Sequence, residues 1–292
     1  MKDRLVRATD QDGKIRVLVA TATNMVEEAR KIHNTSPTAT AALGRGLVAG
    51  TLMGSMMKNE EDILTLKIDG NGPGGEILIV ARNNGEVKGE IMHPEVDLPS
   101  KGNGKLDVGG LVGKDGNITI IMDLGLKEPY IGVSKLISGE IAEDLANYYA
   151  YSEQKPTVVS LGVLVDKDIS VKAAGGYIIQ LLPGSTEEDI VTVEEALDKI
   201  KPVSELVDQG LEAEEIMDTI FEDLEMKILA SEDIAYKCDC SKEKIRDVLK
   251  NLGKTELESM IQEDHGAEVV CHFCNTKHIF DKKELEEIMI DI

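Results

Sequence analysis

The 292-residue sequence contains no tryptophan and only three phenylalanines, and aromatic residues make up 3% of the chain. Leucine, isoleucine, valine, alanine and the eleven methionines must therefore fill its hydrophobic core. Hydrophobic residues account for 42% of the sequence and charged residues for 29%. This composition is typical of a folded globular protein, and the length allows more than one domain.

Positive charge is also scarce, because the sequence has 32 lysines and arginines but 54 aspartates and glutamates. The resulting net charge of −22 repels phosphate backbones, so we expect no nucleic-acid partner. The imbalance is greatest in residues 185–237, where 17 acidic residues accompany four lysines. We interpret this part of the chain as a strongly solvated segment.

The sequence has no long uninterrupted apolar run. Its first residues lack the apolar stretch of a signal peptide, which favours a cytoplasmic location. Residues 39–57 carry a single charge, Arg45, and repeat glycine at Gly46, Gly50 and Gly54, as paired transmembrane helices do. Arg45 and the many small residues make this run too weakly hydrophobic for a membrane. We therefore predict a buried helix, no membrane association, and a glycine stripe that lets another element approach closely.

Cysteine is equally rare, and all four cysteines lie in the C-terminal fifth of the chain: Cys238, Cys240, Cys271 and Cys274. In a reducing compartment, clustered cysteines more often bind metal or sense redox conditions than form structural disulfides. Four thiolates match tetrahedral zinc coordination, so we predict one Zn²⁺ per chain bound by these four residues. Such a site leaves no coordination position for a substrate, which argues against zinc catalysis.

The single residue between Cys238 and Cys240 raises a second interpretation. A disulfide between cysteines so close in sequence is strained, and strained disulfides tend to be labile and regulatory. Oxidation of any ligand removes the metal, and a small domain should then unfold. From the residues alone, structural zinc and redox-switch zinc both remain open. The nearby histidines are most simply exposed residues: His265, His272 and His278.

No pattern predicts an active site. Gly70-x-Gly72-x-x-Gly75 matches a dinucleotide-binding fingerprint, but Pro73 lies inside it and a strand-like run follows where a helix is needed. We predict a hairpin loop there and no enzyme. Two alternative functions of the cysteine site remain open. One is a thiol–disulfide oxidoreductase using Cys271 and Cys274, and the other is an interaction module with constitutive structural zinc.

Periodicity predicts an α+β fold with a largely antiparallel N-terminal sheet domain around the buried helix, over residues 1–184. An acidic helical linker follows over residues 185–233, opened by a capping box and carrying a thin apolar stripe that should dock only weakly. Residues 234–292 should form a small C-terminal zinc-binding domain of helices and one hairpin. A domain with so small a core needs an additional source of stability, which the bound metal would supply.

Several motifs together resemble the redox-regulated 33-kDa chaperonin family of heat-shock holdases. The cysteine layout ending in Cys-His-Phe-Cys-Asn is one of them, and the others are spread along the chain: Pro37–Arg45, Gly104–Asp107, Asp123–Leu126, Ser138–Glu140 and Ala174–Gly184. The likeness runs the length of the sequence, and all four cysteines have counterparts.

The resemblance implies a function that the residues alone do not supply. In this family the reduced, zinc-bound protein is an inactive monomer. Oxidative stress forms the disulfides Cys238–Cys240 and Cys271–Cys274, zinc leaves, and the C-terminal domain and linker unfold. The protein then dimerises, and newly exposed apolar surface captures unfolding client proteins without ATP.

Overall fold

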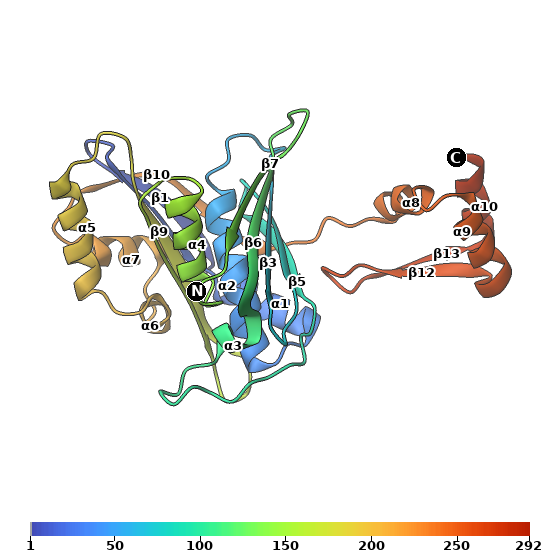
Figure 1. Cartoon of the computed structure of the whole chain (residues 1–292), viewed down its shortest axis with the longest axis horizontal. Coiled ribbons are helices and arrows are strands. Elements are labelled where there is room, and N and C mark those ends of the chain that lie inside the picture. The colour runs from blue at the N-terminus through green and yellow to red at the C-terminus, as the bar shows by residue number, and fades with distance from the viewer. Residues whose placement is uncertain (1) are drawn as a thin grey trace. The chain divides into compact units, whose positions relative to one another are not determined.

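The computed structural model describes residues 2–292, which form two compact units. One unit ends at Lys237 and the other comprises Cys238–Ile292 (Figure 1). Mainly antiparallel sheets combined with helices confirm the predicted α+β class. Among the helices of residues 2–292, none has both the length and the apolar character needed to cross a membrane.

The first unit contains a five-stranded antiparallel sheet in the order β10-β1-β2-β9-β8. Its first two strands form the predicted hairpin, in which Gly13 adopts a positive φ of 69° at the turn. The strands of this sheet are β1 (Arg4–Asp10), β2 (Ile15–Thr21), β8 (Thr157–Val165), β9 (Val171–Leu181) and β10 (Met226–Asp233).

A six-stranded sheet completes the strands of this unit, in the order β11-β5-β4-β3-β6-β7. All neighbours are antiparallel except the short β11, which pairs in parallel with β5. The glycine-rich segment 70–75 joins β3 to β4 as a hairpin connection, as predicted. The strands are β3 (Ile63–Asn71), β4 (Ile77–Arg82), β5 (Glu86–Ile91), β6 (Gly113–Asp123), β7 (Tyr130–Lys135) and β11 (Ala235–Tyr236).

Helix α2 (Pro37–Gly54) is the predicted buried helix and packs between the two sheets (Figure 1). It begins at the Ser36 cap, whose hydroxyl accepts a hydrogen bond from the Ala39 amide at 3.2 Å. The glycine stripe faces β4 so closely that a Cβ on Gly50 would lie 2.6 Å from a methyl of Ile79. The predicted close approach is thus confirmed. The remaining helices of this core are α1 (Thr23–His33), α3 (Val108–Val112) and α4 (Ala142–Tyr151).

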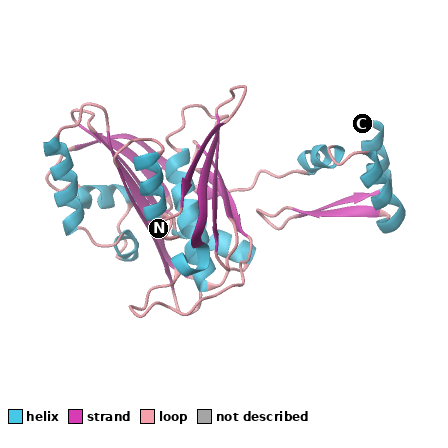
Figure 2. Ribbon diagram, in the orientation of Figure 1, coloured by secondary structure: helices cyan, strands magenta, loops and turns pink. Residues whose placement is uncertain are grey.

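The acidic segment forms three helices on the opposite face of the five-stranded sheet, so that helices flank this sheet on both sides (Figure 2). They are α5 (Glu187–Lys199), α6 (Val203–Asp208) and α7 (Ala213–Ile220). Helices α6 and α7 bury Leu206 and Ile216 against the strands, whereas Val193 is the one fully buried side chain of α5. The charged segment therefore has a substantial apolar face, but its first helix is lightly anchored.

The end of this segment differs from the predicted helical linker, because residues 226–233 form strand β10 beside β1. Ile228 and Leu229 are both exposed on this edge strand, so no apolar–polar alternation marks it in the sequence. The next residues also belong to the first unit: Ile234 is buried in its main core, and the Tyr236 hydroxyl donates to the Gly89 carbonyl at 2.8 Å.

The second unit is built from short, sequence-local elements around a core of five buried side chains: Leu249, Leu257, Phe280, Leu285 and Ile288. One hairpin and four helical segments make it up, as the sequence predicts apart from the π-helical turn η1. They are α8 (Lys242–Lys250), α9 (Lys254–Ser259), η1 (Met260–Asp264), β12 (Gly266–Val270), β13 (Lys277–Asp281) and α10 (Lys282–Ile290).

Candidate metal and redox site

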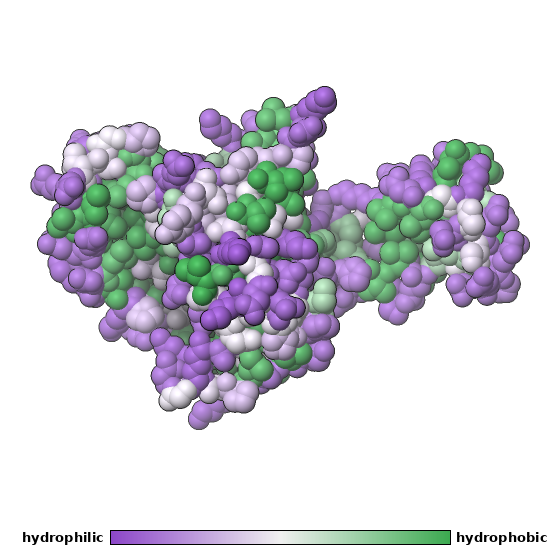
Figure 3. Space-filling view, in the orientation of Figure 1, coloured by the Kyte–Doolittle hydropathy of each residue, from purple (hydrophilic) through white to green (hydrophobic). Residues whose placement is uncertain are grey.

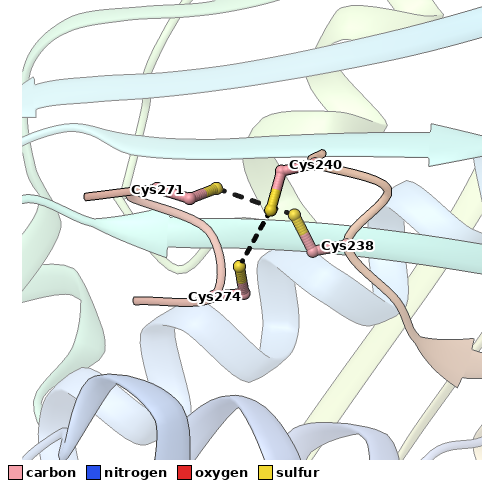
Figure 4. A group of neighbouring side chains, drawn as sticks. All are labelled: Cys238, Cys240, Cys271 and Cys274. Carbon is pink, nitrogen blue, oxygen red and sulfur yellow. Dashed lines mark hydrogen bonds between the residues drawn. The ribbon is translucent and has the colours of Figure 1, made fainter. Parts of the chain in front are cut away.

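The four cysteines come together in the second unit (Figure 4). Cys238 and Cys240 lie on the extended segment before α8, whose N-terminus is capped by Ser241. Cys271 and Cys274 lie on the turn between β12 and β13. Residues more than 30 positions apart in sequence thus converge on one point, as the spacing predicts.

Backbone hydrogen bonds shape the turn that holds the second pair. The Asn275 amide donates to the Cys271 carbonyl at 2.8 Å, and the Cys271 amide donates to the Thr276 carbonyl at 2.9 Å. Asn275 adopts a φ of 55°, a left-handed conformation that asparagine tolerates better than most residues. Both sulfurs of this turn point toward the first cysteine pair (Figure 4).

The sulfur geometry fits a tetrahedral metal site. All four Sγ atoms lie within 4.8 Å of one another; Cys238 and Cys271 are 3.7 Å apart, and Cys240 and Cys274 are 3.4 Å apart. Four sulfurs bound to one zinc at about 2.3 Å would be separated by roughly 3.8 Å, which is close to these distances. The four thiols are free, because each contact far exceeds the bond length of a disulfide, about 2.05 Å.

The protonation of the thiols depends on their surroundings. Burial raises the pKa of Cys238 to about 11 and also raises that of Cys240, with the neighbouring thiols contributing. Burial acts in the same direction at Cys274, but hydrogen bonds from the side chain and amide of Thr276 outweigh it and lower its pKa to about 7. Without a cation, such a cluster therefore holds mostly protonated thiols, whereas a bound divalent metal favours the thiolate form of every ligand.

Two polar side chains beside the sulfurs are absent from the predicted site. Thr276 Oγ1 lies 3.2 Å from Cys274 Sγ, and His278 Nε2 lies 3.4 Å from Cys240 Sγ. The expectation that His278 is simply exposed is therefore wrong: it is half-buried, because strand β13 carries it back along the hairpin toward the first cysteine pair. His265 and His272 are exposed, as expected. The contact of His278 depends on tertiary structure, so spacing alone cannot reveal it.

A salt bridge fixes the segment between the first two cysteines. Lys244, in the first turn of α8, donates to the Asp239 carboxylate at 2.6 Å and to its carbonyl at 2.9 Å. Cys240 directly precedes the Ser241 cap at the N-terminus of α8, so the same short segment carries both the second cysteine and the start of the helix. Among these thiols, Cys274 is the one whose surroundings lower its pKa, whereas burial raises the pKa of Cys240.

Comparison with known proteins places this geometry in context. The sequence profile of the family described as Hsp33 protein matches residues 3–281. The chain is 48% identical to the 33 kDa chaperonin of Clostridium tetani and 47% identical to that of Clostridium beijerinckii, each over 99% of this chain and at least 98% of the relative.

A solved structure agrees over the whole fold. The crystal structure of the 33 kDa chaperonin from Thermotoga maritima, a heat shock protein 33 homologue, superposes with a TM-score of 0.91 at 37% identity, covering 100% of this chain and 99% of that one. The names of these relatives agree with the expectation of a chaperone that is not an enzyme. The predicted resemblance is confirmed, and the chain belongs to the Hsp33 family of chaperonins.

Proposed function

We propose that this protein is a redox-regulated, ATP-independent holdase that the four cysteines keep inactive while they are reduced. The observation that carries the proposal is the convergence of four free thiols, spaced for one tetrahedral metal, in a unit with only five buried apolar side chains. The metal we assign is Zn²⁺, bound by Cys238, Cys240, Cys271 and Cys274. When bound, it neutralises the thiolates and holds the two halves of the unit together.

Oxidation supplies the switch. By family resemblance, disulfides form between Cys238 and Cys240 and between Cys271 and Cys274. Counting each sulfur as a thiol, a pair loses two electrons and two protons to one hydrogen peroxide, which becomes two waters. Each disulfide removes two ligands, so the set of four that matches zinc no longer exists.

Loss of the second unit would act on the linker through the continuous chain. Cys238 follows directly on Lys237, whose amide donates to the Val87 carbonyl at 2.8 Å beside the short β11. We infer that this edge frays first, followed by β10 and the three acidic helices. Helix α5 is held by one fully buried side chain, and its neighbourhood shows apolar side chains at the surface (Figure 3).

The surface beneath the linker suits unfolded clients. Val17, Val19 and Ile179 of the five-stranded sheet are almost completely buried under α6 and α7. Removing these helices would expose a continuous apolar sheet face of the kind that binds partners or a second copy. We therefore assign client capture and oxidative dimerisation to residues 1–184, control to the acidic linker 185–233 with the short β11 that follows it, and sensing to Cys238–Ile292, in a cytoplasmic protein.

One experiment tests the switch. The reduced protein is loaded with zinc and treated with hydrogen peroxide under mild heat while zinc release, helicity, molecular mass and aggregation of a thermally unfolding client are followed. We expect zinc release, loss of helicity, dimer formation and suppression of aggregation to occur together and to reverse on reduction. Zinc that stays bound through oxidation, or equal protection by the reduced form, would contradict the proposal.

The same samples separate the two rival functions. Turnover of a small disulfide substrate would favour an oxidoreductase, although Cys271 is buried and Cys274 lies on a hairpin turn rather than at a helix N-terminus. An interaction module with constitutive zinc would show neither zinc release nor a gain in client protection.

A further inference from the structure

A cavity of about 430 Å³ lies inside the first unit, between the two sheets at the C-terminal end of α2. Its size is in the range of sites for small organic molecules. Four of its wall residues are methionines, and the other apolar side chains come from strands of the six-stranded sheet, the loop after β6 and helix α4. The four methionines are Met53, Met56, Met57 and Met122.

Arg16 brings a positive charge into this wall. Its position on β2 alternates with Val17, so its side chain lies on the face that carries Leu18 and Ala20 into the main core. One guanidinium nitrogen donates to the Gln180 side-chain oxygen. The Nε atom is buried and has no hydrogen-bond partner. Within residues 2–292, no carboxylate forms an ion pair with this guanidinium.

The groups around Arg16 do not compensate its charge. Arg7 is a second nearby cation that repels it, and burial lowers the pKa of Arg16. Tyr149 stays neutral, because burial raises the pKa of its hydroxyl. A half-buried cation without a counter-charge is unfavourable in the free protein and attracts an anion that can reach it.

The two carboxylates of the cavity wall are already engaged elsewhere. Glu153 accepts hydrogen bonds from Tyr148 at 3.0 Å and Lys155 at 2.9 Å. Asp62 accepts hydrogen bonds from the amide and side chain of Asn59, closing its own turn. The cavity therefore combines an apolar wall with a half-buried guanidinium that lacks a counter-charge, while its two lysines are the exposed Lys58 and Lys155, which is paired with Glu153.

We propose that this cavity binds one small organic acid with an unbranched apolar tail, with its carboxylate at Arg16 and its tail along the methionines. Methionine side chains are flexible and polarisable, so their surface adapts to a straight alkyl chain. A carboxylate would supply the counter-charge that the guanidinium lacks and could form a charge-assisted hydrogen bond with it. The site involves neither the cysteines nor the face covered by the linker, so it is independent of the proposed switch.

The test is calorimetric titration of the reduced, zinc-loaded full-length protein with decanoate below its micelle concentration. We expect one equivalent to bind, with affinity weakened at least about tenfold in Arg16→Gln and largely retained in Arg16→Lys. Lys135→Gln removes an exposed cation on β7, outside the cavity wall, and should leave the affinity unchanged. Decanol, which has the same tail without the charge, should bind at least about tenfold more weakly.

A second readout locates the ligand and checks that the variants fold. Methyl-labelled methionine spectra should show decanoate shifting the signals of Met53, Met57 and Met122, each assigned by its Met→Leu variant, while the signal of Met289 in the second unit stays in place. Dispersed spectra of Arg16→Gln would show that its loss of binding is not unfolding. Absence of binding, equal affinity for decanol, or an unchanged affinity in a folded Arg16→Gln would overturn the proposal.

Discussion

At the scale of single residues, the sulfur atoms depend on neighbours that hold them in place. Thr276 contributes its hydroxyl and its amide to Cys274, and both lower the pKa of that thiol. Groups of this kind fix the orientation of metal ligands and keep them ionised, and their loss typically weakens metal binding by about 10–100-fold. The neighbours of the cysteines are therefore part of the proposed sensor.

Replacing Thr276 by valine should weaken zinc binding about tenfold, because the hydroxyl is lost while the shape of the side chain is kept. The measurement is competition for zinc against a chromogenic chelator under reducing conditions. Thr276→Ser keeps the hydroxyl and is the matched control, which should bind zinc almost like the parent. Equal affinities of the valine variant and the parent would show that the 3.2 Å contact does not support the ligand.

Glu27 ties helix α1 to the five-stranded sheet. Its carboxylate accepts hydrogen bonds from Arg30 Nε at 2.7 Å and from the Val171 amide of β9 at 2.9 Å. The Arg30 guanidinium is the main reason why the pKa of Glu27 falls to about 2. A carboxyl with a pKa below its unfolded value stabilises the fold at neutral pH and loses this contribution as pH falls toward its folded pKa.

Glu27→Gln should therefore lower the free energy of unfolding of the first unit by about 1–3 kcal/mol at pH 7. The difference from the parent should shrink below about pH 4 and vanish only below about pH 2, where the Glu27 carboxyl is protonated in the folded protein as well. Urea titrations across this pH range measure it. Glu28→Gln, at the exposed neighbouring position, should have little effect at any pH. A difference that stays constant with pH would rule out the ionised carboxylate as its source.

At the scale of secondary-structure elements, the sequence predicts what short-range patterns determine. The β1–β2 hairpin, helix α2 with its glycine stripe and the C-terminal hairpin all follow from periodicity, turns and caps within a few residues. Strand β10 does not, because its pairing with β1 joins segments more than 200 residues apart and leaves apolar residues exposed. Likewise, the cysteine pattern predicts the four sulfurs of the site, whereas His278 reaches Cys240 only through the fold of the hairpin.

Helix α7 is the element whose release should activate the protein. Ile216 is completely buried between this helix and the sheet, and Thr219 lies exposed on the same helix. Ile216→Asp would bury an unpaired carboxylate at a cost of at least about 3 kcal/mol, so the helix should detach. We expect the reduced, zinc-bound variant to suppress client aggregation without oxidant, as light scattering would show.

Thr219→Asp adds the same charge to α7 without disturbing its buried face, and it should remain inactive while reduced. Two results together would contradict the proposal that helix α7 keeps the protein inactive by covering the apolar face of the sheet. One is an Ile216→Asp variant that stays inactive although limited proteolysis shows its linker to be open. The other is activation by Thr219→Asp, which would point to charge rather than exposure of the sheet.

At the scale of the whole molecule, stability is divided unequally between the two units. The first unit has a large core around α2 and a second core under the linker, whereas the second unit has five buried side chains and the cysteine cluster. Folded units of about 60 residues are marginal without a staple, and a structural zinc site contributes roughly 10–16 kcal/mol. From this balance we expect the folding of the second unit to depend on metal and that of the first unit to be independent of it.

Free zinc should therefore control the melting of the second unit, and of the linker that depends on it, but not the melting of the main core. A ligand that binds only the folded state stabilises it in proportion to the logarithm of its concentration, which gives about 1.4 kcal/mol for each tenfold rise. In calorimetric scans of the reduced protein over a series of buffered zinc concentrations, the transition of Cys238–Ile292 should move steadily upward, while that of the main core stays fixed. With excess chelator and a reductant present, the first transition should disappear. A single transition that moves as a whole would mean that the two units unfold together. A second unit that melts at the same temperature without metal would mean that its small core is enough to keep it folded. Loss of zinc could then not trigger the switch.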